Sequence, residues 1–308
     1  MIALVTGATG FAGGHLLDCL AASQDEVHAV AHLGGQPPQP RPGVQWSAVD
    51  LLERPAVRAV LERARPAVIY HCAGLADVTD AARSPARALR INALGTHTLL
   101  EACREAGVSC RIVVTGSALI YAPRATAISE DDPIAPANPY GVSKLAQELT
   151  AMASGLPVLV ARPFNHAGPR QSAAYASSAF AQQIAQIEAG RAEPVLRVGN
   201  LDAQRDITDV RDTVRAYRAL AEHGTPLRPY NVCSGRAYRM RELLDILVAM
   251  ARVRVRVEVD PARLRPSDNP IVLGSHARLT ADTGWRPEIP IEQTMSDLLG
   301  YWRAATAA

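Results

Sequence analysis

The first half of the chain alternates short apolar, β-branched runs with stretches in which apolar residues recur at helical spacing. Ile2–Thr6 has the first pattern, and Gly13–Ala22 has the second, with its leucines on one face. The alternation continues to residue 162 and predicts further elements. The strands are Glu26–Ala31, Gln45–Val49, Ala67–His71, Arg111–Thr115 and Pro157–Arg162, and the helices are Arg54–Arg63, Ala86–Ala106 and Gly141–Ala153. This order predicts βαβ units and an α/β fold with a doubly wound parallel sheet.

Beyond residue 162 the rhythm loosens, and polar loops separate the remaining predicted helices. These are Ala174–Ala189, Val210–Glu222, Arg239–Ala251 and Ile291–Trp302. The pattern favours a smaller C-terminal region that binds a substrate. We therefore expect residues 1–165 to form a cofactor-binding domain, to which the segment of about 203–235 returns. Residues 166–308 would form mainly the substrate-binding region.

A glycine-rich segment, TGATGFAG at residues 6–13, joins the first predicted strand to the first helix. Gly7 allows a tight turn, Gly10 lets a pyrophosphate approach the backbone, and Gly13 lets the helix pack against the strand. The helix N-terminus favours negative charge at the same point. Glycines at this spacing between a strand and a helix predict a dinucleotide-binding loop of the Rossmann type, against the alternative of a purely structural turn.

The end of the second predicted strand bears on the choice of cofactor. No Asp or Glu near His32 is available to accept the 2′-hydroxyl of the adenosine ribose, so nothing there repels a 2′-phosphate. His32 and Arg41 are the groups placed to meet such a phosphate. The sequence therefore favours NADP(H) and leaves NAD(H) open. Asp50, after the third strand, is placed for the adenine end of the cofactor or, equally, for capping the next helix.

Tyr140 and Lys144 belong to the sequence YGVSK at the start of a predicted helix. Four residues of separation put them on one helical face, one turn apart. A tyrosine pKa near 10 suits acid–base work poorly, and a nearby ammonium is expected to lower it. Ser117 follows a strand whose carboxyl end shares an edge of the sheet with the glycine loop. Its hydroxyl can hold a substrate oxygen while Tyr140 exchanges a proton with it.

Composition narrows the class of protein. The formal net charge of +2 is spread along the chain, which argues against nucleic-acid binding. The five cysteines are odd in number and form no CxxC pair, so we expect reduced core thiols and no zinc site or other metal site. No apolar run reaches the ~20 residues of a membrane span, and the N-terminus has no signal-peptide layout. Cytoplasm is the expected location, without membrane association.

Several longer strings carry a resemblance to a known family. The glycine loop, HCAG at 71–74, RINALGT around Asn92, GSALIY at 116–121 and YGVSK are similar to those of extended short-chain dehydrogenases. Strings of the second half closely resemble GDP-4-keto-6-deoxy-D-mannose reductases. They are RPFNHAGPRQ (162–171), AFAQQIAQIEAG (179–190), RVGNLDAQRDITDVRD (197–212), YNVCSGRAY (230–238) and DPARLRPSD (260–268). The resemblance covers nearly the whole chain.

The resemblance implies a reaction: NAD(P)H reduces the C4 ketone of GDP-4-keto-6-deoxy-D-mannose to GDP-D-rhamnose or its C4 epimer. Tyr140 would protonate the oxygen, Ser117 would orient it, and Lys144 would tune Tyr140. Related 4,6-dehydratases carry a carboxylate two residues after the catalytic Ser or Thr. Leu119 stands there in this chain and cannot take a proton, which argues against dehydration.

The predicted site residues fall into three groups. The catalytic group is Ser117, Tyr140 and Lys144. The cofactor-binding group is Gly7, Thr9, Gly10, Phe11, Gly13, His32, Asp50, Leu51, Ala73, Gly74, Asn92, Tyr140 and Lys144. The substrate-binding group is Ser117, Asn165, Arg205, Arg265 and Asp268. The arginines are included because their forked guanidinium matches a diphosphate or a guanine edge, with a solvated surface arginine as the alternative.

Two other functions stay open at this level. A nucleotide-sugar C4 epimerase would keep NAD tightly bound and consume none of it. A non-enzymatic protein that senses NAD(P) would use the same fold, although it would not need all three catalytic residues. The family resemblance also implies a homodimer through a helix pair around Ala86–Ala106 and Gly141–Ala153.

Overall fold

The structure is a computed structural model that describes residues 1–33, 41–264 and 269–307. Its largest sheet has seven strands in the order β10-β6-β5-β4-β1-β2-β3, and every neighbouring pair is parallel. They are β1 (Ile2–Thr6), β2 (Glu26–Ala31), β3 (Val44–Ala48), β4 (Val68–His71), β5 (Arg111–Thr115), β6 (Val158–Pro163) and β10 (Pro229–Val232). The chain winds outward from β1 in both directions, so the predicted doubly wound parallel sheet is confirmed.

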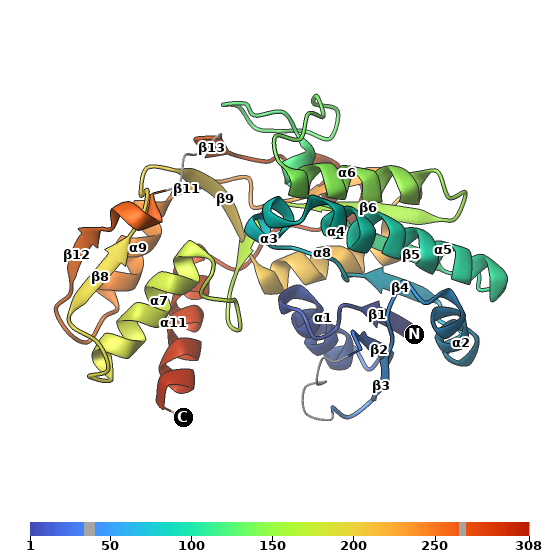
Figure 1. The fold of residues 1–308 in the computed structure, drawn as a ribbon, viewed down its shortest axis with the longest axis horizontal. Coiled ribbons are helices and arrows are strands. Elements are labelled where there is room, and N and C mark those ends of the chain that lie inside the picture. Colours follow the sequence, from blue (N-terminus) through green and yellow to red (C-terminus); the bar gives the residue numbers. More distant parts are fainter. Residues whose placement is uncertain (34–40, 265–268, 308) are drawn as a thin grey trace.

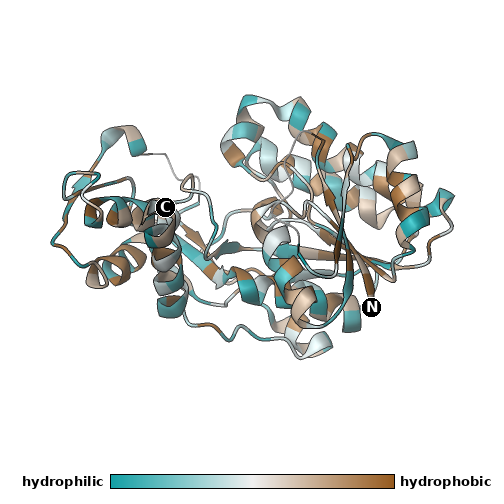
Figure 2. Cartoon of the chain, turned by 90° about the horizontal axis from the view of Figure 1, so that it is seen from below, coloured by the Kyte–Doolittle hydropathy of each residue, from teal (hydrophilic) through white to brown (hydrophobic). Residues whose placement is uncertain are grey.

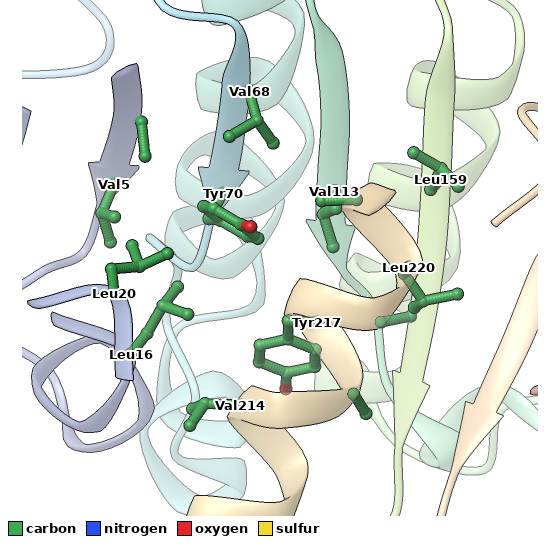
Figure 3. Packing of buried hydrophobic residues seen from close by; sticks show 14 of the residues in the cluster. Val5, Leu16, Leu20, Val68, Tyr70, Val113, Leu159, Val214, Tyr217 and Leu220 are labelled. Carbon is green, nitrogen blue, oxygen red and sulfur yellow. The ribbon is translucent and has the colours of Figure 1, made fainter. Parts of the chain in front are cut away.

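Helices cover both faces of this sheet (Figure 1). On one face lie α1 (Phe11–Ala22) and α8 (Val210–His223), and on the other lie α2 (Arg54–Ala64), α5 (Gly95–Glu105) and α6 (Pro139–Met152). Figure 3 shows the first of these interfaces, where apolar side chains of α1 and α8 meet those of the strands. The labelled residues are Val5, Leu16, Leu20, Val68, Tyr70, Val113, Leu159, Val214, Tyr217 and Leu220, all buried. Burial on both faces explains why the inner strands β1, β4, β5 and β6 are mostly apolar, as the strands at the centre of Figure 2 show.

The register of the parallel strands brings four loops to one edge of the sheet. Thr6 at the end of β1 pairs with His71 at the end of β4, which in turn pairs with Val114 of β5. Thr115 pairs with Ala161 of β6. The loops that leave these strands are therefore neighbours, and they carry the glycine segment, HCAG, Ser117 and Asn165.

The predicted helix Ala86–Ala106 is wrong as a single α-helix. The structure has a short helix α4 (Pro85–Leu89), a π-helical turn (Arg90–Leu94) and then α5. The π turn inserts one residue into the helical repeat, which turns the fully buried Asn92 toward the loop after β4. Periodicity alone could not reveal this insertion because the residues on either side are good helix formers.

The second half contains more strands than its sequence predicted. One small sheet joins β7 (Asn165–Ala167), β9 (Gln204–Asp209), β11 (Ala237–Arg239) and β13 (Ile271–Val272), and another joins β8 (Val195–Val198) to β12 (Arg256–Val259). These strands have two to six residues, too few for a clear period-two pattern, and they form because distant segments pair. Within the segment 203–235, α8 and β10 pack on the central sheet, whereas β9 belongs to the small one.

A separate apolar core holds this region together. It lies among α7 (Ala176–Glu188), α9 (Met240–Ala249) and α11 (Ile291–Ala307), together with β8, β9 and β11. The remaining helical elements are α3 (Val78–Arg83), α10 (Ala277–Thr283) and the 3₁₀ turns Ala118–Ile120 and Pro261–Arg263. In Figure 1 this region lies beside the central sheet, with β9 between the two. Among the residues described, no helix has the length and apolar character needed to cross a membrane.

Candidate active site

The glycine loop between β1 and α1 leaves no room for a side chain at Gly7 or Gly13. Gly7 has φ +67°, and a Cβ there would lie 2.6 Å from the backbone nitrogen of Ala73. A Cβ on Gly13 would lie 2.2 Å from the carbonyl oxygen of Gly7. Gly10 begins the helix, and no described side chain caps it. The first N–H groups of α1 are thus available to an anion, which fits a pyrophosphate.

Three residues, His32, Arg41 and Asp50, were predicted to lie near the adenosine part of the cofactor, and the structure gives the surroundings of each. His32 is exposed, while Arg41 donates hydrogen bonds to Asp18 and to the carbonyl of Gly14 on α1. The Asp50 carboxylate accepts from the backbone N–H of Leu52 at 2.9 Å. The helix-capping alternative for Asp50 is wrong, because α2 begins later and Glu53 occupies its N-cap position.

Leu51 lines a small apolar cavity between the central sheet and α2, together with Val30, Val49, Val57 and Leu99. The cavity has a volume of about 10 Å³, too small for an adenine ring, so the contact of Leu51 with the cofactor stays a prediction. Thr9 is exposed on the glycine loop, and Phe11 opens α1 half-buried. These positions fit a dinucleotide that runs from the adenine end past the helix N-terminus toward Tyr140.

Ser117, Tyr140 and Lys144 meet at the edge of the central sheet. Asn138 accepts from the N–H of Gly141 at 2.9 Å and starts α6, so Tyr140 lies in its first turn. Ser117 follows β5, and its Oγ accepts from the N–H of Leu119 at 3.1 Å. The Ser117 hydroxyl is left to form a hydrogen bond with Tyr140, which acts to lower the pKa of the phenol. All three side chains are at most 8% exposed, so they lie in a desolvated site.

Burial dominates the electrostatics of the trio. It raises the pKa of Tyr140 to about 12, despite the opposing hydrogen bond from Ser117, and it lowers the pKa of Lys144 to about 8. The expected lowering of the tyrosine pKa by the ammonium is therefore wrong for this state of the site. The reason is geometric: the Lys144 ammonium donates to the carbonyl of Thr115 and to Oε1 of Gln147, both at 2.6 Å. A phenol with a high pKa stays protonated near neutral pH and can act as an acid.

Asn92 organises the loop that follows β4. Its Oδ1 accepts from the N–H of Leu75 at 2.7 Å, and its amide donates to the carbonyl of Leu75 and to Oγ of Ser143. The loop Ala73-Gly74 is thereby held against α6. A Cβ on Gly74 would lie 2.7 Å from Asn92 Oδ1 and 3.7 Å from Lys144 Nζ, so glycine keeps space open beside the ammonium.

The predicted substrate residues lie toward the C-terminal region. Asn165 starts β7 and is exposed, and its backbone pairs with Ile207 of β9. Arg205 lies two residues earlier on β9, partly buried, where its guanidinium donates to the carbonyls of Gln204 and Pro270. Strands β7 and β9 therefore bring these two residues to the same part of the small sheet. Arg265 and Asp268 lie outside the described residues.

Several residues near the site were not predicted as members of it. His166, next to Asn165, stacks on Phe11 with ring centroids 5.6 Å apart, so β7 reaches the glycine loop. Tyr175, before α7, is close enough to Tyr140 for its charge to raise the pKa of the Tyr140 phenol. Gln147 contacts Lys144 directly. Tyr175 and Gln147 belong to no short motif, and His166 lies in the string RPFNHAGPRQ without a predicted role, so only the fold could show these contacts.

One signal in the sequence could have marked Lys144 independently. It is the only lysine of the chain, and every other one of the 32 lysine and arginine side chains is an arginine. An arginine stays charged and spreads its charge over a planar fork, whereas lysine places a compact ammonium whose pKa shifts on burial. A chain that uses arginine everywhere else keeps lysine where those properties matter.

Comparison with known proteins agrees with this geometry. The model of the family "GDP-mannose 4,6 dehydratase" matches residues 4–298, and the chain belongs to this family. With the glycine loop and the grouped Ser117, Tyr140 and Lys144, membership makes the chain an NAD(P)-dependent oxidoreductase. The family relationship confirms the resemblance found in the sequence.

Particular relatives are more informative. The chain is 40% identical to GDP-6-deoxy-D-mannose reductase of Pseudomonas aeruginosa, over 97% of this chain and 96% of that protein. The structure of RMD from P. aeruginosa complexed with NADPH matches with a TM-score of 0.88 and 37% identity, covering 99% of this chain and 100% of the other. The NAD complex of UDP-glucose 4-epimerase from Thermus thermophilus matches with a TM-score of 0.86 and 29% identity, over 99% and 100% of the two chains.

Proposed function

We propose that the protein reduces the C4 ketone of GDP-4-keto-6-deoxy-D-mannose to GDP-D-rhamnose or its C4 epimer, with NADPH as the reductant. The observation that carries this proposal is the full-length similarity to a GDP-6-deoxy-D-mannose reductase in a chain whose Ser117, Tyr140 and Lys144 meet. We also propose that residues 1–165, with α8 and β10, bind the cofactor, and that the rest of the chain binds mainly the nucleotide sugar through Asn165 and Arg205.

The residues divide the chemistry as follows. When bound, the reduced nicotinamide supplies the hydride to C4. Tyr140 donates its phenolic proton to the C4 oxygen, so the ketone becomes an alcohol. Ser117 would turn its single hydroxyl hydrogen from Tyr140 to the same oxygen, while its Oγ continues to accept from the N–H of Leu119. Lys144 would stabilise the phenolate left on Tyr140 through the N–H that Thr115 and Gln147 do not accept, and these fixed groups favour the charged transition state over the neutral ketone.

Leu119 separates this reaction from dehydration. Its side chain packs in a small apolar cluster with Leu75, Ala81 and Tyr140. A 4,6-elimination needs a group there that moves protons at the sugar ring, and an alkyl side chain offers none. The high pKa of Tyr140 also suits a reductase, which needs a proton donor at neutral pH.

Measuring the absorbance of NADPH tests the proposal. Purified protein with GDP-4-keto-6-deoxymannose should oxidise one NADPH for each ketone reduced, and product NMR should show a C4 alcohol. A C4 epimerase would interconvert sugars without net consumption of the cofactor, and that result would replace our proposal. If Tyr140→Phe left the biological action of the protein unchanged, a cofactor-sensing role would be favoured instead.

The preference for NADPH over NADH rests on the end of β2, where the sequence has no Asp or Glu. The residues there, Ala31 and His32, offer no carboxylate that would repel the 2′-phosphate of NADPH. Competition between NADPH and NADH for the substrate-free enzyme should therefore favour NADPH. Tighter binding of NADH would contradict the preference without affecting the assignment of the reaction.

We propose a homodimer formed by the two helical segments that expose apolar side chains. Leu94 of the π turn is 48% exposed, and Val142 and Leu149 of α6 are 45% and 59% exposed. Burial of such side chains against a second copy would be favourable. Sedimentation at micromolar concentration should give the mass of a dimer, and Leu149→Glu should shift it toward the monomer. We further propose a cytoplasmic enzyme, since its cysteines are unpaired.

A further inference from the structure

A chain of buried hydrogen bonds connects Gln147, which contacts Lys144, to Thr6 at the start of the glycine loop. It begins at the N–H of Ala73, which donates to Oγ1 of Thr6 at 3.3 Å, and Thr6 meets Nδ1 of His71 at 2.7 Å. His71 Nε2 meets Oγ1 of Thr96 at 2.8 Å. The amide of Gln147 donates to the same Thr96 oxygen at 3.0 Å. The four side chains are at most 1% exposed, so water does not compete with these bonds.

The direction of each bond follows from counting hydrogens. Thr96 has one hydroxyl hydrogen, and it is donated to the carbonyl of Asn92 at 2.6 Å, since a carbonyl can only accept. The Thr96 oxygen must then accept from both Gln147 and His71, so His71 carries its hydrogen on Nε2. Its Nδ1 accepts from the Thr6 hydroxyl. Burial lowers the pKa of His71 to about 3, so the ring stays neutral in this tautomer.

This arrangement fixes the orientation of the Gln147 amide. With its NH₂ group on Thr96, its Oε1 must face the other way, and there it accepts from Lys144 Nζ at 2.6 Å. A second hydrogen of the ammonium goes to the carbonyl of Thr115 at 2.6 Å. No third acceptor for it lies within hydrogen-bond distance in the described ranges. The third N–H therefore has a defined direction, next to the space that Gly74 keeps open.

We propose that Gln147 is a positioning residue that holds the Lys144 ammonium, and that Thr96, His71 and Thr6 lock the amide of Gln147 in the required orientation. The proposal rests on the proposed function only in taking Lys144 as a member of the catalytic group. The same chain of bonds reaches Thr6, the first residue of the glycine loop, and Ala73, whose backbone lies against Gly7. It therefore ties the orientation of the lysine to the segment that fits the pyrophosphate.

Few titratable groups surround the ammonium. Cys72, in the loop after β4, raises the pKa of Lys144 slightly against the effect of burial, and His71 of β4 is neutral. Tyr140 lies one turn earlier on α6. Tyr217 of α8 is sensitive to charge on both Cys72 and Tyr140. None of these groups is charged near pH 7, so Gln147 is well placed to control the proton affinity of Lys144.

A single lysine makes this control directly measurable. Protein labelled with ¹⁵N-lysine has one side-chain resonance, that of Lys144, which can be titrated by NMR without cofactor or substrate. Gln147→Leu removes the acceptor at similar volume and should lower the measured pKa by about one unit. Gln147→Glu adds a negative charge and should raise it by about one unit or more. A structural defect alone would not move the two titrations in opposite directions.

Further variants complete the test. Thr96→Val should lower the lysine pKa in the same direction as Gln147→Leu, and Thr96→Ser, which keeps the hydroxyl, should restore it. Gln293→Leu and Gln293→Glu make the same chemical changes at an exposed position of α11 and should leave the titration unchanged. The alkaline limb of the kcat/KM profile for ketone reduction should move with the NMR pKa of each variant.

Two results would overturn the proposal: an unchanged lysine titration in Gln147→Leu, or shifts of the same sign in the leucine and glutamate variants. If circular dichroism shows that Gln147→Leu does not fold, the lysine titration of Thr96→Val tests the proposal instead. Valine is isosteric with threonine, so this variant should keep the packing. Loss of GDP-sugar reduction in the wild-type protein would count against the proposed function alone, since the NMR titration needs no turnover.

Discussion

The central sheet and the C-terminal sheets supply the site by different means. In the central sheet, each functional segment directly follows a parallel strand, and the register places Gly7, Ser117 and the loop after His71 side by side. In the C-terminal region, short strands from distant parts of the chain are joined around one buried carboxylate. Asp206 of β9 accepts from Ser234 and Gly235 in the loop after β10, and from Gly274 after β13, so its carboxylate joins three segments.

This difference is consistent with the proposed division of the chain into a cofactor-binding part and a substrate-binding part. A scaffold built from repeated βαβ units can hold the cofactor and the proton donor rigidly, because its core is buried on both faces of the sheet. A region assembled by long-range pairing can change its short strands and loops without disturbing that core, and so it can adapt to a particular substrate. Substitutions in the central sheet should therefore change kcat or NADPH affinity. Substitutions in the C-terminal region should change the KM for the substrate.

The largest effect is expected at the proton donor. Tyr140→Phe removes the phenolic hydroxyl but keeps the ring in its apolar cluster. We expect kcat for ketone reduction to fall by roughly 10²- to 10⁴-fold, with little change in melting temperature or in NADPH affinity. Stopped-flow absorbance and thermal melts measure these quantities. Activity within about tenfold of the wild type would mean that another group delivers the proton.

A smaller effect, confined to the cofactor side, is expected at the glycine loop. Gly7→Ala would place a Cβ 2.6 Å from the backbone nitrogen of Ala73, at a residue with positive φ, so the loop would have to shift. We expect about tenfold to hundredfold weaker NADPH binding, corresponding to roughly 1–3 kcal/mol of strain, measured by fluorescence titration. Gly284→Ala is the matched control, since its φ is +74° with no atom within 4 Å of the Cβ. Equal effects of the two changes on NADPH binding would argue against crowding.

On the substrate side, Arg205→Lys keeps a positive charge and removes the forked guanidinium. We expect KM for the GDP-sugar to rise by about tenfold while NADPH affinity and kcat stay near wild type, because a bidentate contact with a diphosphate becomes a single one. Steady-state kinetics with each substrate varied in turn would show this. A change in NADPH affinity instead would mean that the two regions do not act separately.

The smallest effect concerns pH. Burial lowers the pKa of Lys144 to about 8, so kcat/KM should be about half its plateau near that pH and fall further above it, while Tyr140 remains protonated. The stability of the folded protein should change in the opposite direction to kcat/KM as the pH rises. A buried ammonium costs stability below pH 8, and that cost fades as pH rises toward the usual lysine value of 10.5. A pH profile recorded beside thermal melts therefore separates loss of the ammonium from unfolding.

The sequence by itself determined the parts of this protein that depend on local order. Apolar periodicity predicted the strands and helices of the doubly wound sheet, and the glycine loop, Ser117 and YGVSK marked its edge, because parallel strands put their carboxyl ends together. Local patterns could not predict the π turn at Asn92, nor the strands that bring Asn165 and Arg205 to one sheet.

The tertiary structure alone decided the electrostatics. Whether an ammonium lowers the pKa of a phenol depends on burial and on which acceptors the lysine meets, and Thr115 and Gln147 are its partners here. Those partners come together through the packing of β5 and α6 and through Thr96 on α5. Long-range packing sets the dielectric surroundings and the hydrogen-bond partners of a side chain, and sequence spacing carries no information about either.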